Sequence, residues 1–393
     1  MLHILNFQFS LIELICFAVL MLSFSYQLYF YIRYIRVVLR SKKIKRKTTK
    51  TYAKGKLPVS VIITARNQSE NLRKFLPLIL TQNYPEYEVI VVNDGADEDT
   101  KDLLELYTRT YPQLRTTFVP SEANNRSTKK LALTLGVKAA KYDWLLFTEA
   151  DCFPDGENWI QNIARNFIPD NEFVLAYSAY SPKRSLINKL ITFDNLFNAL
   201  RYLGYAKVGK PYMGVGRNIA YKKEVFFKQN GFASNLHLVE GDAELMVNYA
   251  ANKQNIDIEV SAESLTWSQP AKSFKAWYFQ KEKALSITTF YRAKSKFLLF
   301  AEPFARLLFY ASFITLTILS LLMGNWPLSV LAGLIFIGRL CMQIRIINKT
   351  SSYFKGQKYY LSLLLFDIIL PVIALVIMTF GRIGSKSKHI SWK

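Results

Sequence analysis

The stretch Trp144-Leu145-Leu146-Phe147-Thr148-Glu149-Ala150-Asp151 joins an apolar run to two carboxylates that stand two residues apart. Apolar residues followed by polar ones predict a buried strand that ends near Phe147. Carboxylates at such a strand end can point to the same side, and oxygen ligands suit Mg²⁺ or Mn²⁺. A solvated turn is the plainer interpretation, because polar residues gather at turns. The surrounding segments must therefore decide between a metal site and a turn.

These surrounding segments alternate between strand and helix patterns over residues 58–290, the expected soluble domain. The order of strands and helices predicts an α/β fold: a mostly parallel sheet with helices on both faces. Ligands of such sheets bind beyond the carboxyl ends of the strands, where Arg66, Asp94 and Asp151 fall. The expected strands are Val59–Ile63, Val89–Val92, Thr116–Val119 and Trp144–Phe147, and the expected helices are Glu70–Leu80, Asp99–Thr110 and Lys129–Lys141.

Composition narrows the class of protein. The chain has 393 residues, a net charge of +22 and 51% hydrophobic residues, which suits a membrane protein with a basic cytoplasmic face. Three scattered cysteines give neither a disulfide framework nor a zinc spacing. Three histidines without a cluster argue against a triad of a nucleophile, a histidine and a carboxylate.

The N-terminal segment is expected to anchor the chain in a membrane. Residues 10–32 are nearly all apolar and long enough to span a bilayer, so residues 1–35 form the predicted anchor. A signal peptide is the alternative, but there is no basic start and no small-residue cleavage site. Nine Lys and Arg residues follow between positions 33 and 50, in a predicted juxtamembrane linker over residues 36–57. These basic residues favour attraction to anionic lipid over nucleic-acid binding. By the positive-inside rule, they place the N-terminus outside and the soluble domain in the cytoplasm. The expected protein is thus a multi-pass protein of the inner or plasma membrane.

The C-terminal region, residues 291–393, is expected to return to the membrane with two or three spans. The candidate segments are Pro303–Met323, Leu328–Ile347 and Tyr359–Phe380, with an external turn at residues 324–327. Four spans in all would place the C-terminus outside, whereas the basic tail from Arg382 onward indicates the inside. Asp367 and Pro371 interrupt the last apolar segment, which leaves spanning, re-entrant and interfacial placements open.

Several short motifs follow one another over residues 58–290, just over half of the chain. They are Val59 to Asn67 with Glu70, Asn93-Asp94-Gly95, Ser127 to Leu133, Glu149-Ala150-Asp151, Gly214 to Tyr221 and Glu240 to Leu245. Taken in this order, they resemble the catalytic domain of inverting family-2 glycosyltransferases, which have a GT-A fold. Asn93 stands where the family more often has Asp, and Glu149-Ala150-Asp151 stands where it has Asp-x-Asp.

The resemblance implies a nucleotide-sugar site at the strand ends. Asp94 could accept a hydrogen bond from the N3–H of uracil, because an ionised carboxylate only accepts. Lys129 would offer a charge to a phosphate, and Lys130 competes for that role. Asp151 would bind the metal, while Glu149 assists directly, acts through water or contacts the ribose. The nucleotide-sugar set implied is Thr64, Ala65, Arg66, Asn67, Glu70, Asp94, Lys129 and Glu149.

The acceptor side is implied by the later motifs. Asp242 is the expected general base, with Glu240 and Glu244 as rivals, because an inverting transfer needs one carboxylate to take the proton of the acceptor hydroxyl. Lys283 and Ala284 stand where relatives carry Arg and Trp, so the aromatic platform of processive relatives is missing. An amphipathic interfacial helix is the alternative for this stretch. The acceptor and diphosphate set implied is Gly214, Gly216, Arg217, Asn218, Gln280 and Lys283.

The sequence thus predicts a membrane-anchored, metal-dependent glycosyltransferase that uses a nucleotide-diphosphate sugar, with UDP as the expected nucleotide. The expected acceptor is a lipid-linked or membrane-proximal glycan, because membrane segments flank the soluble domain on both sides. The expected partners are this donor, the acceptor and membrane lipids, and no nucleic acid. A processive polysaccharide synthase is the first alternative, and a non-catalytic membrane scaffold with a nucleotide-binding fold is the second.

Overall fold

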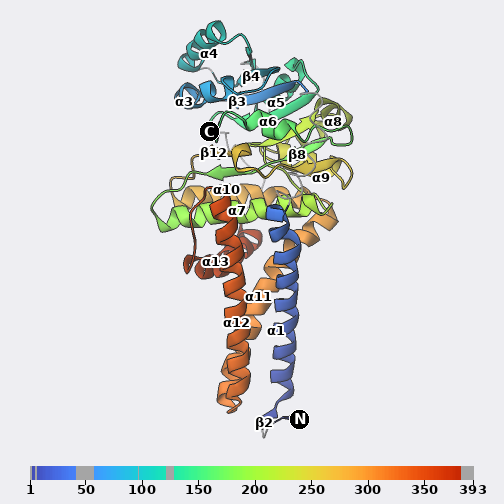
Figure 1. The fold of residues 1–393 in the computed structure, drawn as a ribbon, viewed down its shortest axis with the longest axis vertical. Helices are drawn as coiled ribbons and strands as arrows, with labels where there is room; N and C mark the ends of the chain where they lie inside the picture. Colours follow the sequence, from blue (N-terminus) through green and yellow to red (C-terminus); the bar gives the residue numbers. More distant parts are fainter. Residues whose placement is uncertain (1, 5–6, 41–56, 96, 121–127, 382–393) are drawn as a thin grey trace.

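The computed structural model describes residues 2–4, 7–40, 57–95, 97–120 and 128–381. Figure 1 shows the sheet at one end of the molecule and long helices at the other, with α7 (Leu186–Lys207) and α10 (Phe274–Ile287) lying across the junction. The basic residues from Lys42 to Lys50, Ser127 and the tail from Arg382, all used in the sequence predictions, lie outside the described residues.

Seven strands form the main sheet, in the order β11-β8-β10-β6-β3-β4-β5. Neighbours among β6, β3, β4 and β5 are parallel, whereas β10 is antiparallel to both β6 and β8. The predicted α/β class with a mostly parallel sheet is confirmed. The strands are β3 (Val59–Ala65), β4 (Tyr87–Asn93), β5 (Leu114–Phe118), β6 (Trp144–Glu149), β8 (Phe173–Leu175), β10 (Ile219–Lys222) and β11 (Ile256–Ile258).

Helices cover both faces of this sheet, which explains why its central strands are apolar on both sides. Val61 and Ile63 of β3 pack with one set of helices, and Ile62 packs with the other. The three helices predicted between the first four strands are present within one residue of their expected starts. The first set is α3 (Ser69–Leu80), α4 (Glu98–Thr110) and α6 (Trp159–Ala164), and the second includes α5 (Thr128–Ala139), α7 and α9 (Asp242–Ala250).

Smaller elements complete the described chain. A three-stranded sheet has the order β7-β12-β9, and β1 pairs antiparallel with β2 near the N-terminus. The bounds are β1 (Leu2–Ile4), β2 (Phe7–Phe9), β7 (Phe153–Pro154), β9 (Ser178–Tyr180), β12 (Thr266–Ser268), α8 (Lys223–Lys228), and the 3₁₀ helices η2 (Ala233–Asn235), η3 (Ala262–Ser264) and η4 (Thr288–Phe290).

Four helices in the described chain are long and apolar enough to cross a membrane. The first, α1 (Leu11–Phe30), continues as the π-helix η1 (Tyr31–Ile35), and the others are α11 (Ala293–Leu322), α12 (Trp326–Tyr353) and α13 (Ser362–Phe380). They correspond to the four predicted segments, except that α13 begins three residues later than expected; α11 and α12 are longer than expected because each continues beyond its apolar run. The helices α1, α11 and α12 pack against one another.

The last helix, α13, differs from the other three in where it packs. Asp367 and Pro371 do not break it, since the helix continues through both residues. It packs against α7, α10 and α11. Figure 1 shows it near the end of the bundle that adjoins α7 and α10, while α1 and α12 run along the length of the bundle. This placement favours the interfacial interpretation of the segment over a fourth span.

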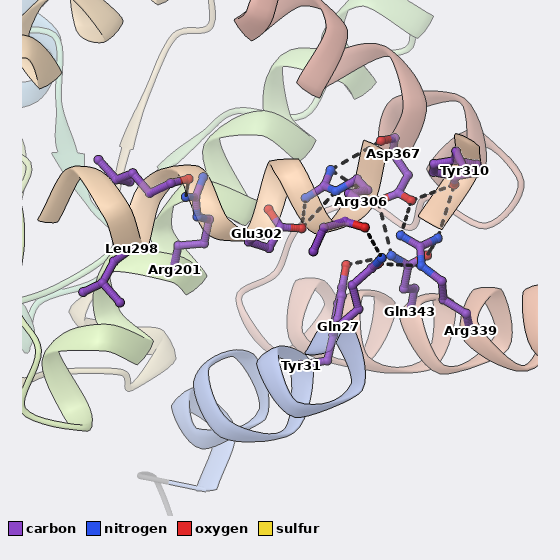
Figure 2. Close-up of polar contacts among 12 residues, drawn as sticks. Gln27, Tyr31, Arg201, Leu298, Glu302, Arg306, Tyr310, Arg339, Gln343 and Asp367 are labelled. Carbon is purple, nitrogen blue, oxygen red and sulfur yellow. Dashed lines mark hydrogen bonds and ion pairs between the residues drawn. The ribbon is translucent and has the colours of Figure 1, made fainter. Parts of the chain in front are cut away.

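Charged and amide side chains join these apolar helices at one buried cluster, shown in Figure 2. Asp367 of α13 accepts from Arg339 of α12 at 2.6 Å and lies 3.3 Å from the Nη1 of Arg306 on α11. Arg306 also pairs with Glu302, and Arg339 donates to the amide oxygen of Gln27 on α1 at 2.6 Å. Ionised side chains are costly among apolar helices unless they are paired, so this cluster fixes how α13 meets the bundle.

The soluble-domain side of the junction depends on a close contact between two backbones. A Cβ atom added to Gly204 of α7 would lie 2.0 Å from the carbonyl oxygen of Tyr34 in η1. Only glycine allows such an approach, because any side chain would overlap the carbonyl. The soluble domain is therefore packed directly onto the first membrane helix.

Candidate active site

The carboxyl ends of β3, β4 and β6 meet at one edge of the sheet, as the sequence predicts. The backbone N–H of Asp94 after β4 donates to the carbonyl of Ala65, the last residue of β3, at 2.7 Å. Glu149 ends β6, the other neighbour of β3, and Asp151 follows two residues later. This arrangement places the predicted nucleotide-side carboxylates along a single edge.

Asp94 has an unusual environment for a carboxylate. Its Oδ2 atom is buried without a hydrogen-bond partner in the described part of the chain. Burial raises the pKa of Asp94, and a hydrogen bond from Thr128 and the charge of Arg66 oppose that rise. A buried acceptor without a donor is costly. This oxygen is therefore a natural partner for an N–H group of a ligand.

A small cavity of about 10 Å³ brings five of the predicted site residues together. They come from β3, α5, β6, the loop before β10 and the start of α9, and they are Thr64, Lys129, Glu149, Gly216 and Asp242. The cavity is much smaller than a nucleotide sugar, since ligand pockets commonly measure several hundred Å³. Side chains must move before a donor can enter.

Lys129 lines this cavity between two carboxylates. Its Nζ atom lies 2.8 Å from the Oε1 of Glu149 and 3.7 Å from the Oδ2 of Asp242. Burial alone would lower the pKa of Lys129, but the carboxylates of Asp242 and Glu149 outweigh burial and hold the pKa well above its usual value. One lysine thus connects the predicted donor side to the predicted base.

The neighbouring Lys130 differs from Lys129 in that its ammonium group binds backbone carbonyl groups. It is fully buried, and its ammonium group donates to the carbonyl oxygens of Asn235, Leu238 and Glu240 at 2.7, 2.8 and 2.9 Å. Burial lowers the pKa of Lys130 to about 8, while Asp242 and Glu240 oppose that shift. Lys130 therefore holds the loop that leads into Asp242, and Lys129 is the lysine that faces the cavity.

The motif that contains Asp242 separates its carboxylates by environment. Gly241 precedes α9 in a left-handed conformation with φ of +89°, which places Asp242 at the first turn of the helix. Glu244 accepts a hydrogen bond from the hydroxyl of Tyr291 at 2.8 Å. Burial raises the pKa of Glu244 to about 8, and the nearby charge of Asp242 adds to the rise. Glu244 is thus held mainly protonated at neutral pH, which makes it the weaker candidate for a base.

The two glycines of the next motif differ in their surroundings. A Cβ atom on Gly216 would lie 3.2 Å from the Oδ2 of Asp242, so this glycine keeps the cavity side of the carboxylate open. A Cβ atom on Gly214 would instead meet the side chains of Ile219 and Val247 at 2.7 and 3.0 Å. Gly214 serves the packing of the core, and Gly216 borders the candidate site.

Asn218 does not lie as the sequence prediction expected. It is only 1% exposed, and its amide nitrogen donates to the carbonyls of Tyr177 and Ser264 at 2.8 and 2.9 Å. Its amide oxygen accepts from the indole of Trp159 at 3.1 Å. With both ends of the amide engaged inside the protein, Asn218 supports the fold and is not brought to the cavity.

Arg217, next to it, influences the carboxylate pair through its charge. Its guanidinium donates to Ser268 at 3.1 Å and to Asn195 at 3.3 Å, and it lies 4.5 Å from the ring centre of Tyr180. Burial raises the pKa of Asp151, and the charge of Glu149 adds to this, whereas Arg217 opposes it. For Glu149, the charges of Lys129 and Arg217 overcome burial and lower the pKa.

The remaining predicted donor residues lie in the loop after β3. Arg66 donates to the hydroxyl of Thr128 at 3.4 Å, next to the start of α5. Asn67 has a positive φ of 51°, and its side-chain oxygen would lie 2.6 Å from a Cβ atom on Gly95. Glu70 is exposed in the first turn of α3. The loops after β3 and β4 are therefore in contact beside Asp94.

The predicted residues Gln280 and Lys283 lie on α10, away from the small cavity. They share one helix face with Ile287, since the three stand at positions i, i+3 and i+7. A Cβ atom on Gly241 would lie 2.9 Å from the side chain of Ile287. This face therefore adjoins the loop that carries Asp242. The helix also lies at the junction with the membrane region in Figure 1, as an interfacial helix would.

The carboxylate pair fits a hard divalent cation. Ligand atoms of Glu149, Asp151 and Cys152 all lie within 4.8 Å of one another. Burial raises the pKa of the Cys152 thiol well above its usual range, and the thiol lies 3.4 Å from the Oδ1 of Asp151 as a donor. A protonated thiol is a poor ligand, so the usable donors are carboxylate oxygens, which suit Mg²⁺ or Mn²⁺. Because Glu149 is paired with Lys129, Asp151 is the more available ligand.

Sequence reasoning missed two aromatic residues at this site. Tyr291 contacts Glu244 from 47 residues further along the chain, and Tyr180 lies under the guanidinium of Arg217. Both come from segments far from the motifs that they touch. No spacing in the sequence indicates such contacts, because tertiary folding alone creates them.

The comparisons with known proteins agree on one family and one fold. Residues 60–228 match the family model described as glycosyl transferase family 2. The poly-beta-1,6-N-acetyl-D-glucosamine synthase of Staphylococcus epidermidis is 27% identical over 139 residues, which are 35% of this chain and 32% of that protein. Glycosyltransferase AglE of Haloferax volcanii is 30% identical over 105 residues, 26% of this chain and 33% of its own. The chain thus matches about a third of the length of these curated relatives.

A solved structure supports the fold over nearly the whole chain. The mannosyltransferase PcManGT from Pyrobaculum calidifontis, determined in complex with GDP-Man and Mn²⁺, superposes with a TM-score of 0.56. The match covers 94% of this chain and 99% of that chain, at 16% sequence identity. This likeness shows that the expected GT-A fold is present.

Proposed function

We propose, from the premise that residues 60–228 belong to glycosyl transferase family 2, that the chain transfers a sugar from a nucleotide-diphosphate donor to a membrane-proximal acceptor with inversion. The observation that carries this proposal is the meeting of Lys129, Glu149 and Asp242 at one cavity, at the carboxyl edge of the sheet. This cavity thus holds a cation that could bind a phosphate, a carboxylate that could bind a metal, and a candidate general base.

Donor binding would use side-chain atoms that lack a hydrogen-bond partner in the described residues or that can exchange their ion-pair partner for the donor. The buried Oδ2 of Asp94 would accept the N3–H of uracil, which supports UDP as the nucleotide. Lys129 would leave Glu149 and Asp242 and move to a phosphate of the donor. This exchange of partners would open the small cavity and would release Asp242 from its closest cation.

The metal, Mg²⁺ or Mn²⁺, would be held by Asp151, with Glu149 joining once Lys129 has moved. When bound, such a cation supplies positive charge that stabilises a diphosphate leaving group. The charge of Arg217 already acts on these carboxylates and would supply a second positive group to the site.

Asp242 would act as the general base. Its carboxylate would take the proton of the acceptor hydroxyl as that oxygen bonds to the anomeric carbon and the bond from this carbon to the diphosphate oxygen breaks. The side chain lies next to the opening that Gly216 leaves, whereas burial raises the pKa of Glu244 to about 8 against the opposing hydrogen bond from Tyr291. Attack from the side opposite to the leaving group gives inversion.

The acceptor would be lipid-linked or membrane-proximal, with the catalytic domain in the cytoplasm and beside a cell membrane. The support for this is that α7 and α10 are seen between the sheet and the apolar helices, so the soluble domain adjoins the candidate membrane helices (Figure 1). Processive polysaccharide synthesis is the second candidate, since one relative is named as a poly-N-acetylglucosamine synthase. Ala284, which stands where processive relatives carry an aromatic residue, favours a single transfer.

Turnover of a panel of UDP- and GDP-sugars by the full chain in lipid nanodiscs tests this proposal. Release of a nucleoside diphosphate that depends on Mn²⁺ or Mg²⁺ is the expected result. Mass spectrometry of the product then separates a single added sugar from a polymer. No release with any donor, in the presence of a membrane extract as the acceptor source, would favour the scaffold alternative.

A further inference from the structure

A basic cavity lies at the junction between the soluble domain and the membrane helices. It has a volume of about 490 Å³ and is lined by Lys183, Arg184 and Lys189 at the start of α7, with Gln357 from the loop between α12 and α13. It is far larger than the cavity at Asp242 and shares no lining residue with it.

The three cations of this cavity are available to a ligand. Lys183 and Arg184 are exposed, and Lys189 is partly buried. In the described part of the chain, none of the three forms an ion pair, and no acidic residue lines the cavity. Elsewhere in the same domain some cations are paired, as Lys207 is with Asp257 at 3.0 Å. A group of unpaired cations around an open space attracts an anion.

Hydrogen bonds connect the chain segments that form the wall of the cavity. The side-chain amide of Gln357 donates to Asn188 at 3.1 Å and to Thr192 at 2.6 Å. Asn188 in turn accepts from the backbone N–H of Lys183 at 2.6 Å. Asn188 and Thr192 are both buried. These bonds tie the loop after α12 to the first turns of α7 beneath the basic side chains.

The surroundings of the cavity are those of a membrane surface. Leu186 and Ile187 at the start of α7 are exposed, and so are Tyr360 and Leu361 in the loop before α13. Figure 1 shows α7 lying across the ends of the membrane helices. Cations next to exposed apolar side chains at this level match a phosphate headgroup attached to acyl chains.

We propose that this cavity binds the phosphate headgroup of an anionic membrane phospholipid, with the acyl chains alongside Leu186 and Leu361. The bound lipid ties α7 to the α12–α13 loop and so sets how the soluble domain sits on the bilayer. This site goes beyond the proposed glycosyl transfer and uses none of its catalytic residues. A negatively charged lipid is required, because a zwitterionic headgroup brings its own cation to the cavity.

Thermal unfolding of the full chain in a nonionic detergent tests the proposal without any turnover. Dioctanoyl phosphatidylglycerol is the anionic lipid probe. Dioctanoyl phosphatidylcholine is the zwitterionic lipid control, and inorganic phosphate is the free-anion control. A ligand that binds only the folded state raises the Tm. We expect a rise with the anionic lipid that neither other arm produces at equal concentration.

The variant that tests the site removes the three charges as Lys183→Gln, Arg184→Gln and Lys189→Gln. We expect the lipid concentration needed for half of the Tm rise to increase roughly tenfold or more. The matched control removes three exposed charges at the far helices, as Lys74→Gln, Lys101→Gln and Lys138→Gln, and it should respond as the wild type does.

Two results would overturn the proposal. An unchanged response in the cavity variant would place the lipid elsewhere on this basic chain. An equal Tm rise with inorganic phosphate, lost in the cavity variant, would identify a site for a free anion. Because the three side chains are exposed or partly buried and lack ion pairs within the described residues, the lipid-free Tm of the variant should match that of the wild type, and the single Lys183→Gln variant supplies a milder version of the test.

Discussion

The buried carboxylate of Asp367 offers a sharp test of the membrane region. It receives hydrogen bonds from Arg339 at 2.6 Å, from Tyr310 at 2.7 Å and from Gln343 at 3.2 Å, and it lies 3.3 Å from Arg306 (Figure 2). The substitution Asp367→Asn keeps the shape and removes the charge. Arg306 then keeps its pairing with Glu302, whereas Arg339 keeps no acidic partner among the described residues.

The expected loss of stability is large because the charge of Arg339 stays buried without compensation. Removing one member of a buried ion pair typically costs about 3–5 kcal/mol, which corresponds to roughly a 10²- to 10⁴-fold change in the unfolding equilibrium. Unfolding in mixed micelles, followed by tryptophan fluorescence, measures this loss. The control Glu105→Gln removes a carboxylate from an exposed pair with Arg109 and should cost less than about 1 kcal/mol.

A double variant separates charge pairing from simple packing. Arg339→Met with Asp367→Leu removes both charges, and apolar replacement of a buried pair is often tolerated. The double variant should therefore be more stable than Asp367→Asn alone. Stability of Asp367→Asn equal to that of the Glu105→Gln control would mean that water reaches the cluster, and the reasoning would fail.

Three further predictions concern the metal, the pH dependence and the topology. Isothermal titration should show that UDP binds more tightly with Mn²⁺ than with EDTA, and that Asp151→Ala removes this difference; equal affinities in all three cases would exclude the metal assignment. Between pH values of about 4.5 and 8, folded Glu244 holds a proton that the unfolded chain has released, so wild-type stability should fall as pH rises, by at most about 1.4 kcal/mol per pH unit from this group. The variant Glu244→Gln should lack this slope in denaturant titrations at pH 6 and 8, and identical slopes would argue against a raised pKa. The proposed topology, in which α1, α11 and α12 cross the membrane and α13 lies at its interface, predicts that reporter fusions after residues 50 and 393 both report the cytoplasm; an external signal after residue 393 would make α13 a fourth span.

The sequence was most informative where local patterns and burial coincide. Apolar runs such as Trp144–Phe147 define the strands because both faces of the sheet are covered, and the polar residues after them fall at one edge by topology alone. The sequence could not separate Lys129 from Lys130, since adjacent helical residues differ only in which side they face. Only the packed loop at residues 235–240 assigns Lys130 to the backbone.

Contacts between distant segments account for the rest. Asn218 was assigned to the acceptor from its motif, yet its amide is used by the core, which depends on Trp159 nearly sixty residues earlier. The partner of Glu244, Tyr291, lies beyond the motif; its hydrogen bond lowers the pKa of Glu244, and burial outweighs it. Likewise, Asp367 interrupts an apolar segment in the sequence, but its role as an ion-pair partner becomes clear only from two arginines in other helices.

The central claim is that Asp242 takes the acceptor proton and does not bind the donor nucleotide. The direct measurement is the rate of sugar transfer by Asp242→Asn, with UDP affinity measured on the same preparation. The account predicts a rate that is lower by about 10²- to 10⁴-fold, with UDP affinity close to wild type. Near-normal transfer by Asp242→Asn, together with loss of transfer in Glu244→Gln, would contradict it.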